Sequence, residues 1–321
     1  MFVFNNRNYF YYLFNWVYSI NIFMNYRVLG NTGIQVSEKG FGCMSLSGNS
    51  ETESINLINN AIDGGINYFD TADIYDDGEN EKLLGKAISG KRKKVILATK
   101  VGNVIKPGGG NGFDWNPTKK HILRSIEGSL QRLKTDYIDL YQLHGGTIDD
   151  PVDETIEAFE ILKQQGKILH YGISSIRPNV IREYLRRSKI VSVMMQYSYL
   201  DRRPEEEILD LLHKNGISVL ARGSLAQGLL VDKAAREYLE YSKEEVASAQ
   251  SILKGLGKSE KNDTASAIAY VLHHKVVSCA VVGMRTVAQL SGALSGRYEI
   301  SAIDYQKLQK AVSPLKYRQH R

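Results

Sequence analysis

Four titratable side chains lie at or just beyond the ends of short apolar runs. They are Asp70, Tyr75, Lys100 and His144. A phenol hydroxyl can donate a proton, and an ammonium group beside it favours the loss of that proton. A carboxylate can hold the ammonium in place, and a neutral imidazole can orient a nearby oxygen by donating a hydrogen bond. Together the four groups could protonate an oxygen atom of a bound substrate.

Each of these residues, taken alone, has an ordinary structural explanation. An Asp directly before a Thr, as at Asp70-Thr71, is often a turn or helix-cap residue. Tyr75 is one of 19 tyrosines in the chain and could be an ordinary one. Lys100 could extend along an apolar surface, and His144 could be a satisfied core histidine. The catalytic interpretation therefore depends on a fold that brings all four side chains to one edge.

Eight short apolar runs alternate with helical-period segments along the chain. The runs are residues 39–44, 66–70, 94–100, 137–143, 168–173, 191–196, 217–221 and 278–282. They lack strict polar alternation, as expected of strands that are buried on both faces. Eight strands alternating with helices over roughly 300 residues predict an α/β fold of the (β/α)₈ TIM barrel type, with a doubly wound sheet as the alternative. In such a barrel, the carboxyl ends of the strands form the active site.

Helix boundaries and one hairpin are also visible in the sequence. The expected helices are 52–63 ending at Gly64-Gly65, 117–133, 151–166, and one opened by Pro204-Glu205-Glu206-Glu207. Residues 26–29 and 34–36 are short extended runs on either side of the turn-like Asn31-Thr32-Gly33, and they predict a β-hairpin.

Six segments lie at the predicted strand ends and in the loops beside them: GINYFDTADIY (65–75), VILATK (95–100), TDYIDLYQLH (135–144), YGISS (171–175), MMQYS (194–198) and LAQGLL (225–230). Together these segments resemble the aldo-keto reductase family. The resemblance covers residues 26–295 and implies a barrel whose bottom is closed by the hairpin. The catalytic Asp, Tyr, Lys and His of that family fall on Asp70, Tyr75, Lys100 and His144. LHGGTI and SSIRPN are most similar to segments of bacterial reductases.

The resemblance implies NADPH-dependent reduction of aldehydes or ketones to alcohols. A nicotinamide supplies the hydride, since no side chain can. Tyr75 would donate the proton to the developing alkoxide. Lys100 would favour the loss of that proton, and Asp70 would hold Lys100 charged and in place. His144 would orient the carbonyl of this small-molecule substrate.

The same resemblance implies contacts to the nicotinamide end of the cofactor. Ser174, Ser175 and Gln196 would bind the carboxamide, although the family usually has Asn where Ser175 stands. Arg222 replaces the aromatic residue that commonly stacks on the nicotinamide. A guanidinium plane can stack on a ring and can also reach a phosphate.

The remaining cofactor contacts are expected near the chain's last two strands. Those residues are Gly223, Leu225, Gly228, Gly283, Arg285 and Gln289. Small residues permit close approach to the pyrophosphate. Arg285 at a helix N-terminus would bind the 2′-phosphate, which favours NADPH over NADH. Ala293 stands where the family has an Asn that contacts adenine, so a weaker adenine contact is expected.

Residues 102–116 form a glycine-rich stretch with two open interpretations. It is either a mobile connector or a substrate lid in which Phe113 or Trp115 closes over the carbonyl. This stretch and residues 199–203 are expected to select the substrate.

Other motifs do not complete a site. Gly85–Lys91 has Walker spacing, but Arg92 stands where Ser or Thr must hold magnesium, and the segment comes after a helix. Lys91–Lys94 is interpreted as a solvated turn at the bottom of the barrel. His273-His274 has no acidic or cysteine ligands at metal spacing, so no metal site is expected.

Composition limits the class of protein. Hydrophobic residues make up 43% and charged residues 24%, which is typical of a globular domain. Two cysteines, Cys43 and Cys279, cannot form a disulfide framework, so a reducing, cytoplasmic location is expected. The net charge of +6 could help to bind an anionic small molecule, but no concentrated basic tract indicates nucleic-acid binding.

Residues 1–23 differ from the rest of the chain. They are rich in Phe, Tyr and Asn, and they lack both the features of a secretory signal and a continuous apolar span of membrane length. We expect an extension outside the fold, upstream of a natural start at Met24, with an interfacial membrane anchor as the alternative. Residues 24–321 are expected to form the barrel domain.

Two other functions remain open. The first is a cofactor-bound regulatory module, because potassium-channel β-subunits resemble the same family. The second is a Schiff-base aldolase with Lys100 as nucleophile, although this leaves the spacing of Asp70 and Tyr75 without a reason. The natural substrate, the direction of the reaction and the oligomeric state are not set by any motif.

Overall fold

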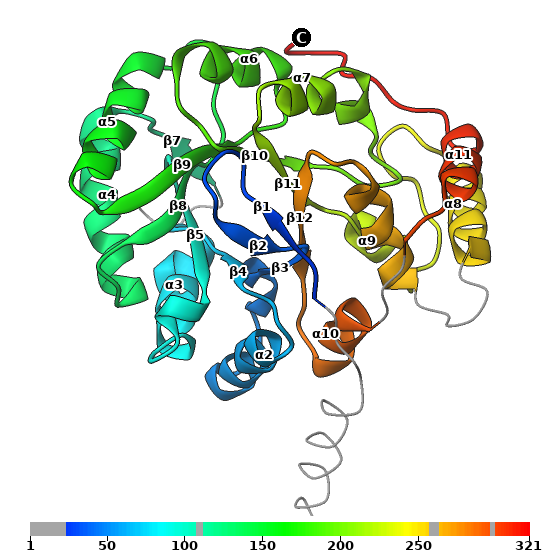
Figure 1. The fold of residues 1–321 in the computed structure, drawn as a ribbon, viewed down its shortest axis with the longest axis horizontal. Coiled ribbons are helices and arrows are strands. Elements are labelled where there is room, and N and C mark those ends of the chain that lie inside the picture. The colour runs from blue at the N-terminus through cyan, green and yellow to red at the C-terminus, as the bar shows by residue number, and fades with distance from the viewer. Residues whose placement is uncertain (1–23, 107–111, 257–262, 296–298) are drawn as a thin grey trace, which may run out of the picture.

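A computed structural model describes residues 24–106, 112–256, 263–295 and 299–321, and eight parallel strands in it close into a barrel (Figure 1). The strands are β3 (Lys39–Gly42), β4 (Tyr68–Asp70), β5 (Ile96–Val101), β8 (Ile138–Leu143), β9 (Ile168–Ser174), β10 (Ser192–Gln196), β11 (Ser218–Arg222) and β12 (Val277–Gly283). They follow one another in chain order, and β12 pairs with β3. Each strand overlaps one of the eight apolar runs, and β5, β9, β11 and β12 extend one residue beyond it at one or both ends. The TIM barrel is therefore confirmed, and the doubly wound sheet is wrong.

Helices surround the barrel (Figure 1). They are α2 (Glu51–Asp63), α3 (Glu79–Ala87), α4 (Lys119–Leu133), α5 (Val152–Gln164), α6 (Pro178–Arg187), α7 (Ile208–Lys214), α8 (Lys243–Leu256), α9 (Asp263–His273), α10 (Val287–Leu294) and α11 (Ala302–Ala311). Short 3-10 turns cover Cys43–Leu46, Tyr75–Gly78, Arg92–Lys94, Arg203–Glu206 and Ala226–Gly228.

Local capping explains why the helices begin where they do. Ser50 and Glu53 form a reciprocal capping box at the start of α2, and Thr118 caps α4. The prediction that an α-helix begins at Pro204 is wrong. Residues Arg203–Glu206 form a 3-10 turn, the backbone leaves helical geometry at Glu207, and α7 begins only at Ile208.

The predicted hairpin closes one end of the barrel. Its strands, β1 (Tyr26–Val28) and β2 (Gln35–Ser37), pair antiparallel. Leu29 and Val36 are fully buried in the same apolar cluster as inward-facing barrel residues such as Leu140. Ser278 Oγ donates a hydrogen bond to the Val28 carbonyl (2.9 Å), so the hairpin is fixed to the barrel.

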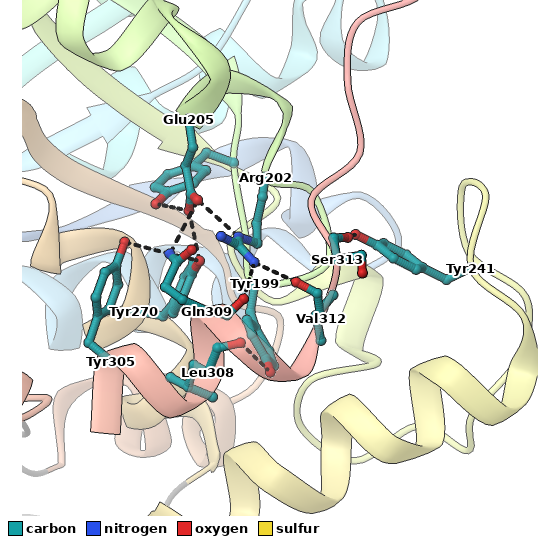
Figure 2. A network of polar contacts seen from close by, with 11 residues as sticks. Tyr199, Arg202, Glu205, Tyr241, Tyr270, Tyr305, Leu308, Gln309, Val312 and Ser313 are labelled. Atoms are coloured by element: carbon teal, nitrogen blue, oxygen red, sulfur yellow. Dashed lines mark hydrogen bonds and ion pairs between the residues drawn. The ribbon is translucent and has the colours of Figure 1, made fainter. Parts of the chain in front are cut away.

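The C-terminal segment is tied to the loop after β10 by a buried polar network (Figure 2). Glu205 accepts hydrogen bonds from Tyr197 (2.9 Å), Tyr270 (2.7 Å) and Arg202 (2.9 Å). Arg202 also donates to the carbonyls of Gln309 (3.1 Å) and Val312 (2.6 Å). This network attaches α11 to the barrel.

The Lys91–Lys94 turn is only partly solvated. Lys93 and Lys94 are exposed as expected. Arg92 instead forms a 2.6 Å ion pair with the buried Asp139 and donates to Thr135 Oγ (2.9 Å), so it has a structural role.

Three further expectations concern metals, membranes and the N-terminus. Within the described residues, no cluster of His, Cys, Asp and Glu could hold a metal ion, and His273 stacks on Tyr305. Across the same ranges, no helix combines the length and apolar character needed to cross a membrane. Residues 1–23 lie outside the described part, so their assignment stays a prediction.

Candidate active site

Three adjacent barrel strands bring the four chemically active side chains together. Asp70 ends β4, Lys100 lies near the end of β5, and His144 directly follows β8. Tyr75 begins the short turn after β4. Because β4, β5 and β8 are parallel neighbours, their carboxyl ends meet at one edge. All four side chains line one cavity of about 950 Å³.

Lys100 is the centre of this arrangement. Its Nζ donates to Asp70 Oδ2 (2.6 Å), to the Thr71 carbonyl (2.7 Å) and to the Tyr75 hydroxyl (3.4 Å). An ammonium group has three donors, so these contacts account for all of them. Burial alone would lower the pKa of Lys100, but the charge of Asp70 and the contact with Tyr75 outweigh it and raise the pKa. Lys100 therefore stays positively charged beside the phenol.

His144 lies beside Tyr75 and is neutral at neutral pH. The two rings meet edge to face, with centroids 5.7 Å apart. Burial, reinforced by the positive charges of Lys100 and Arg222, lowers the pKa of His144 to about 3. Its Nδ1 is buried and has no hydrogen-bond partner among the described residues. A neutral imidazole in this position can bind a substrate oxygen.

Residues outside the predicted four hold the site in place. Gln142 Nε2 donates to Asp70 Oδ1 (3.3 Å). Asn80 accepts a hydrogen bond from Thr71 Oγ (2.8 Å) and donates to the Cys43 carbonyl (2.9 Å), which fixes the loop that carries Tyr75. Gln142 could have been found from the sequence, because it stands two residues before His144 and alternate strand residues share a face. No motif predicts Asn80.

The expected cofactor residues border two adjoining cavities. Ser174, Ser175, Gln196 and Arg222 line the 950 Å³ cavity. Leu225, Gly228, Arg285 and Gln289 line a second cavity of about 420 Å³. Gly223 and Gly283 line both. All ten residues thus border two adjoining cavities, which we together call the trough.

The larger cavity is also lined by a tyrosine, Tyr238, that was not predicted from the sequence. Gln196 Nε2 donates to the Tyr238 hydroxyl (2.9 Å), and Gln196 Oε1 accepts from Arg222 Nη1 (3.3 Å). Gly223 has a φ of +71°, and a Cβ there would lie 3.3 Å from Gln196 Cγ. Tyr238 lies in the long connection between β11 and α8, where no sequence pattern marks it.

The far end of the trough is suited to phosphate groups. Arg285 donates from Nε to the Ser45 carbonyl (3.0 Å), and its backbone N–H donates to Gln289 Oε1 (2.8 Å). Thr286 caps α10 directly after Arg285. Neither Arg222 nor Arg285 forms an ion pair with a described carboxylate. Glycine-lined walls and unpaired cations in an elongated trough fit a dinucleotide cofactor. Ala293 is fully buried and lines neither cavity.

The described parts of the glycine-rich stretch form two short strands that pair antiparallel. Its strands are β6 (Asn103–Ile105) and β7 (Phe113–Trp115), and residues 107–111 between them lie outside the described ranges. Phe113 and Trp115 both line the larger cavity. Trp115 Nε1 donates to Asp150 Oδ1 (2.8 Å), so this ring is held as a wall of the cavity. Closure of Phe113 over a substrate stays a prediction.

Residues 199–203 do not contribute to substrate selection by contact, which corrects the expectation for that segment. None of them lines either cavity. Tyr199, Asp201 and Arg202 are buried. Tyr199 and Arg202 donate hydrogen bonds to the carbonyls of Leu308 and Val312, whereas Asp201 accepts one from Arg203 within the segment. The segment supports α11 instead.

Known proteins resemble this chain in sequence and in fold. The model of the Aldo/keto reductase family matches residues 40–312. The uncharacterized oxidoreductase YqkF of Bacillus subtilis (strain 168) is 48% identical over 276 residues, which cover 83% of this chain and 89% of that protein. The L-galactose dehydrogenase of Arabidopsis thaliana is 32% identical over 86% of this chain and 89% of its own length. The holo form of the aldo-keto reductase AKR11C1 from Bacillus halodurans superposes with a TM-score of 0.87, at 47% identity over 93% of this chain and 99% of that chain.

Proposed function

The chain belongs to the aldo/keto reductase family of oxidoreductases that act on carbonyl compounds, and on that premise we propose that it reduces aldehydes or ketones with NADPH. One observation carries the proposal. A fully buried ammonium, Lys100, is held by Asp70 at 2.6 Å and contacts the Tyr75 hydroxyl at 3.4 Å on the wall of a large cavity. This arrangement suits proton donation to a substrate oxygen in that cavity.

Each of the four residues has a distinct task in the proposed reaction. When bound, the reduced nicotinamide supplies the hydride. Tyr75 donates its hydroxyl proton to the oxygen that becomes the alcohol. Lys100 stabilises the phenolate that remains, and Asp70 keeps Lys100 charged and in place. Neutral His144 orients the carbonyl by donating a hydrogen bond to its oxygen.

The trough supplies the groups that would hold the cofactor. Ser174 and Ser175 would bind the carboxamide together with Gln196, which Tyr238 positions at 2.9 Å. The backbone at Gly223, Leu225, Gly228 and Gly283 would border the pyrophosphate, and Arg222 would contact the ring or a phosphate. Arg285 and the start of α10, where Gln289 lies, would bind a 2′-phosphate, which supports NADPH over NADH.

The Schiff-base alternative is disfavoured by the environment of Lys100. A nucleophilic lysine must be neutral and must have a free lone pair. Lys100 is instead charged, with its three donors directed at Asp70, Thr71 and Tyr75.

The experiment measures cofactor binding and turnover separately. NADPH and NADH are titrated by fluorescence, and NADPH consumption is followed with a panel of aldehydes and ketones. We expect turnover with NADPH, and we expect Arg285→Ala to weaken NADPH binding by about tenfold or more while NADH binding changes little. Arg186→Ala, on the exposed face of α6, is the control. Tight binding without turnover would favour the regulatory module, and no binding of either nucleotide would reject the proposal.

A further inference from the structure

One part of the larger cavity is not used by the proposed cofactor. We call it the substrate half, and it is lined by Phe113, Trp115, Gly145, Gly146, Thr147, Ile176 and Arg177. It adjoins His144 and therefore the carbonyl that His144 would orient. Its walls are mostly apolar side chains and glycine backbone. Arg177 is the single charged side chain in this set.

Arg177 is fixed in place, but most of its hydrogen-bonding capacity is free. It lies in the loop between β9 and α6, and its Nη1 donates to the Gly146 carbonyl at 2.6 Å. The backbone N–H of Arg177 donates to Ser175 Oγ (3.2 Å). A guanidinium carries five N–H donors. Among the described residues, the Arg177 side chain forms no other hydrogen bond and no ion pair, so four of its donors have no protein partner.

The carboxylate close to this loop is already occupied by other donors. Asp150 accepts hydrogen bonds from Trp115 Nε1 (2.8 Å), from the Thr147 backbone N–H (2.8 Å) and from Thr147 Oγ (2.7 Å). It forms no ion pair with Arg177. Deeper in the cavity, the charge of Asp70 is matched by Lys100. Among the described residues, the guanidinium in the substrate half therefore has no carboxylate in direct contact.

Other partly buried arginines outside the cavity are paired with an acid. Arg92 pairs with Asp139 at 2.6 Å, and Arg132 pairs with Glu81 at 2.7 Å. The unpaired Arg222 and Arg285 border the part of the trough assigned to the cofactor. An unpaired guanidinium in the remaining part indicates that its anion comes from the substrate, because desolvating a charge without a partner is unfavourable.

Two glycines, Gly145 and Gly146, directly follow His144, line the cavity and carry the carbonyl that Arg177 contacts. Gly145 and Gly146 have φ values of +145° and +128°, which favour glycine. A Cβ at Gly145 would lie 3.2 Å from the Trp115 ring, and one at Gly146 would lie 3.1 Å from Val180 Cγ1. The two adjacent glycines thus let Trp115 and Val180 pack directly against the backbone that follows His144.

We propose that Arg177 forms a carboxylate subsite and that the preferred substrates are aldehydes with an aliphatic chain ending in a carboxylate. The guanidinium fork matches the two oxygens of a carboxylate. A single cation between apolar walls suits a monoanion better than a doubly charged phosphate. This inference rests on the proposed function, since it needs the aldehyde to be reduced beside His144.

The test compares ω-oxo carboxylates of increasing chain length with their methyl esters. Each ester keeps the aldehyde and the chain but removes the charge. We expect wild-type kcat/KM at the best length to be at least about tenfold higher for the acid, as for a hydrogen-bonded charged pair. The advantage should shrink as salt is raised. In Arg177→Gln the ratio of acid to ester should fall to about one.

A matched variant controls for net charge. Arg124→Gln removes one exposed, unpaired charge from α4, away from both cavities, and it should keep the wild-type ratio. The inference is overturned if wild type treats acid and ester alike, or if Arg177→Gln keeps the preference. It is also overturned if Arg177→Gln weakens NADPH binding and slows both substrates equally, because Arg177 would then serve the cofactor. Ester turnover in wild type leaves the proposed function standing in each of these cases, whereas no turnover of any carbonyl compound refutes both.

Discussion

Replacing Lys100 by methionine removes the ammonium group while nearly preserving the length of the side chain. The charge lies 3.4 Å from the Tyr75 hydroxyl, where a phenolate forms as the proton leaves. At this separation and an effective dielectric constant of 20, the attraction is about 5 kcal/mol. We therefore expect the rate of carbonyl reduction to fall by about three to four orders of magnitude.

The same substitution leaves the Asp70 carboxylate buried without its ion-pair partner. Only Gln142, at 3.3 Å, remains as a side-chain donor to it. Breaking a buried pair in this way costs about 3–5 kcal/mol in the free energy of unfolding. Urea denaturation measures that loss, and NADPH fluorescence shows whether the variant still binds its cofactor.

The assay is a single-turnover measurement of NADPH oxidation with saturating carbonyl compound. Asp70→Asn provides a second perturbation, because it keeps Lys100 near Thr71 and Tyr75 while removing the carboxylate charge. We expect its rate to lie between those of wild type and Lys100→Met. A folded, NADPH-binding Lys100→Met variant whose rate is within about tenfold of wild type would refute the role assigned to the ammonium.

Three further predictions concern stability. Burial and two neighbouring cations lower the pKa of His144 from 6.5 to about 3, so its contribution to stability is full above pH 6.5 and is lost as the pH falls toward 3. The slope is at most about 1.4 kcal/mol per pH unit, and His144→Gln should flatten it in urea titrations at several pH values. Arg202→Met should reduce the free energy of unfolding by about 3–5 kcal/mol, because Glu205 is left buried without its cation (Figure 2); an unchanged urea midpoint would contradict this. Gly85→Ala should lower the free energy of unfolding by about 1–3 kcal/mol, because the added Cβ would meet the backbone of α4 at 2.7 Å. Gly255→Ala should raise it by about 0.5–1 kcal/mol, because a Cβ there meets nothing within 4 Å. Thermal denaturation of the two variants tests this difference.

The barrel was predictable because parallel strands buried on both faces leave apolar runs in the sequence. Helix starts at Ser50 and Thr118 follow from local capping, which involves residues only a few positions apart. The start of α7 was not predictable in this way. Glu205 lies in a segment with a helix-opening pattern, but its side chain binds Arg202 and the distant Tyr270. Long-range contacts thus override the local preference.

The candidate site likewise contains residues that local sequence predicts and residues that depend on long-range contacts. Asp70, Lys100 and His144 were predictable because strand ends of a barrel converge, and neighbouring strands place them at one edge. Tyr238 and Asn80 were not, since each acts through a partner more than thirty residues away in sequence. Residues 199–203 follow a strand as the catalytic residues do, yet they are buried against α11. Position after a strand therefore indicates a site only when the side chain faces the cavity.

Tyr75→Phe, which removes one hydroxyl group and leaves the ring, tests the proposed role of Tyr75 as proton donor most directly. NADPH consumption with an accepted aldehyde and NADPH binding are measured on the same protein preparation. We predict a loss of turnover by about 10²–10⁴-fold or more, the range for a general acid, with NADPH binding nearly unchanged. Turnover close to that of wild type would contradict the assignment of Tyr75 as the proton donor and, with it, the proposed mechanism.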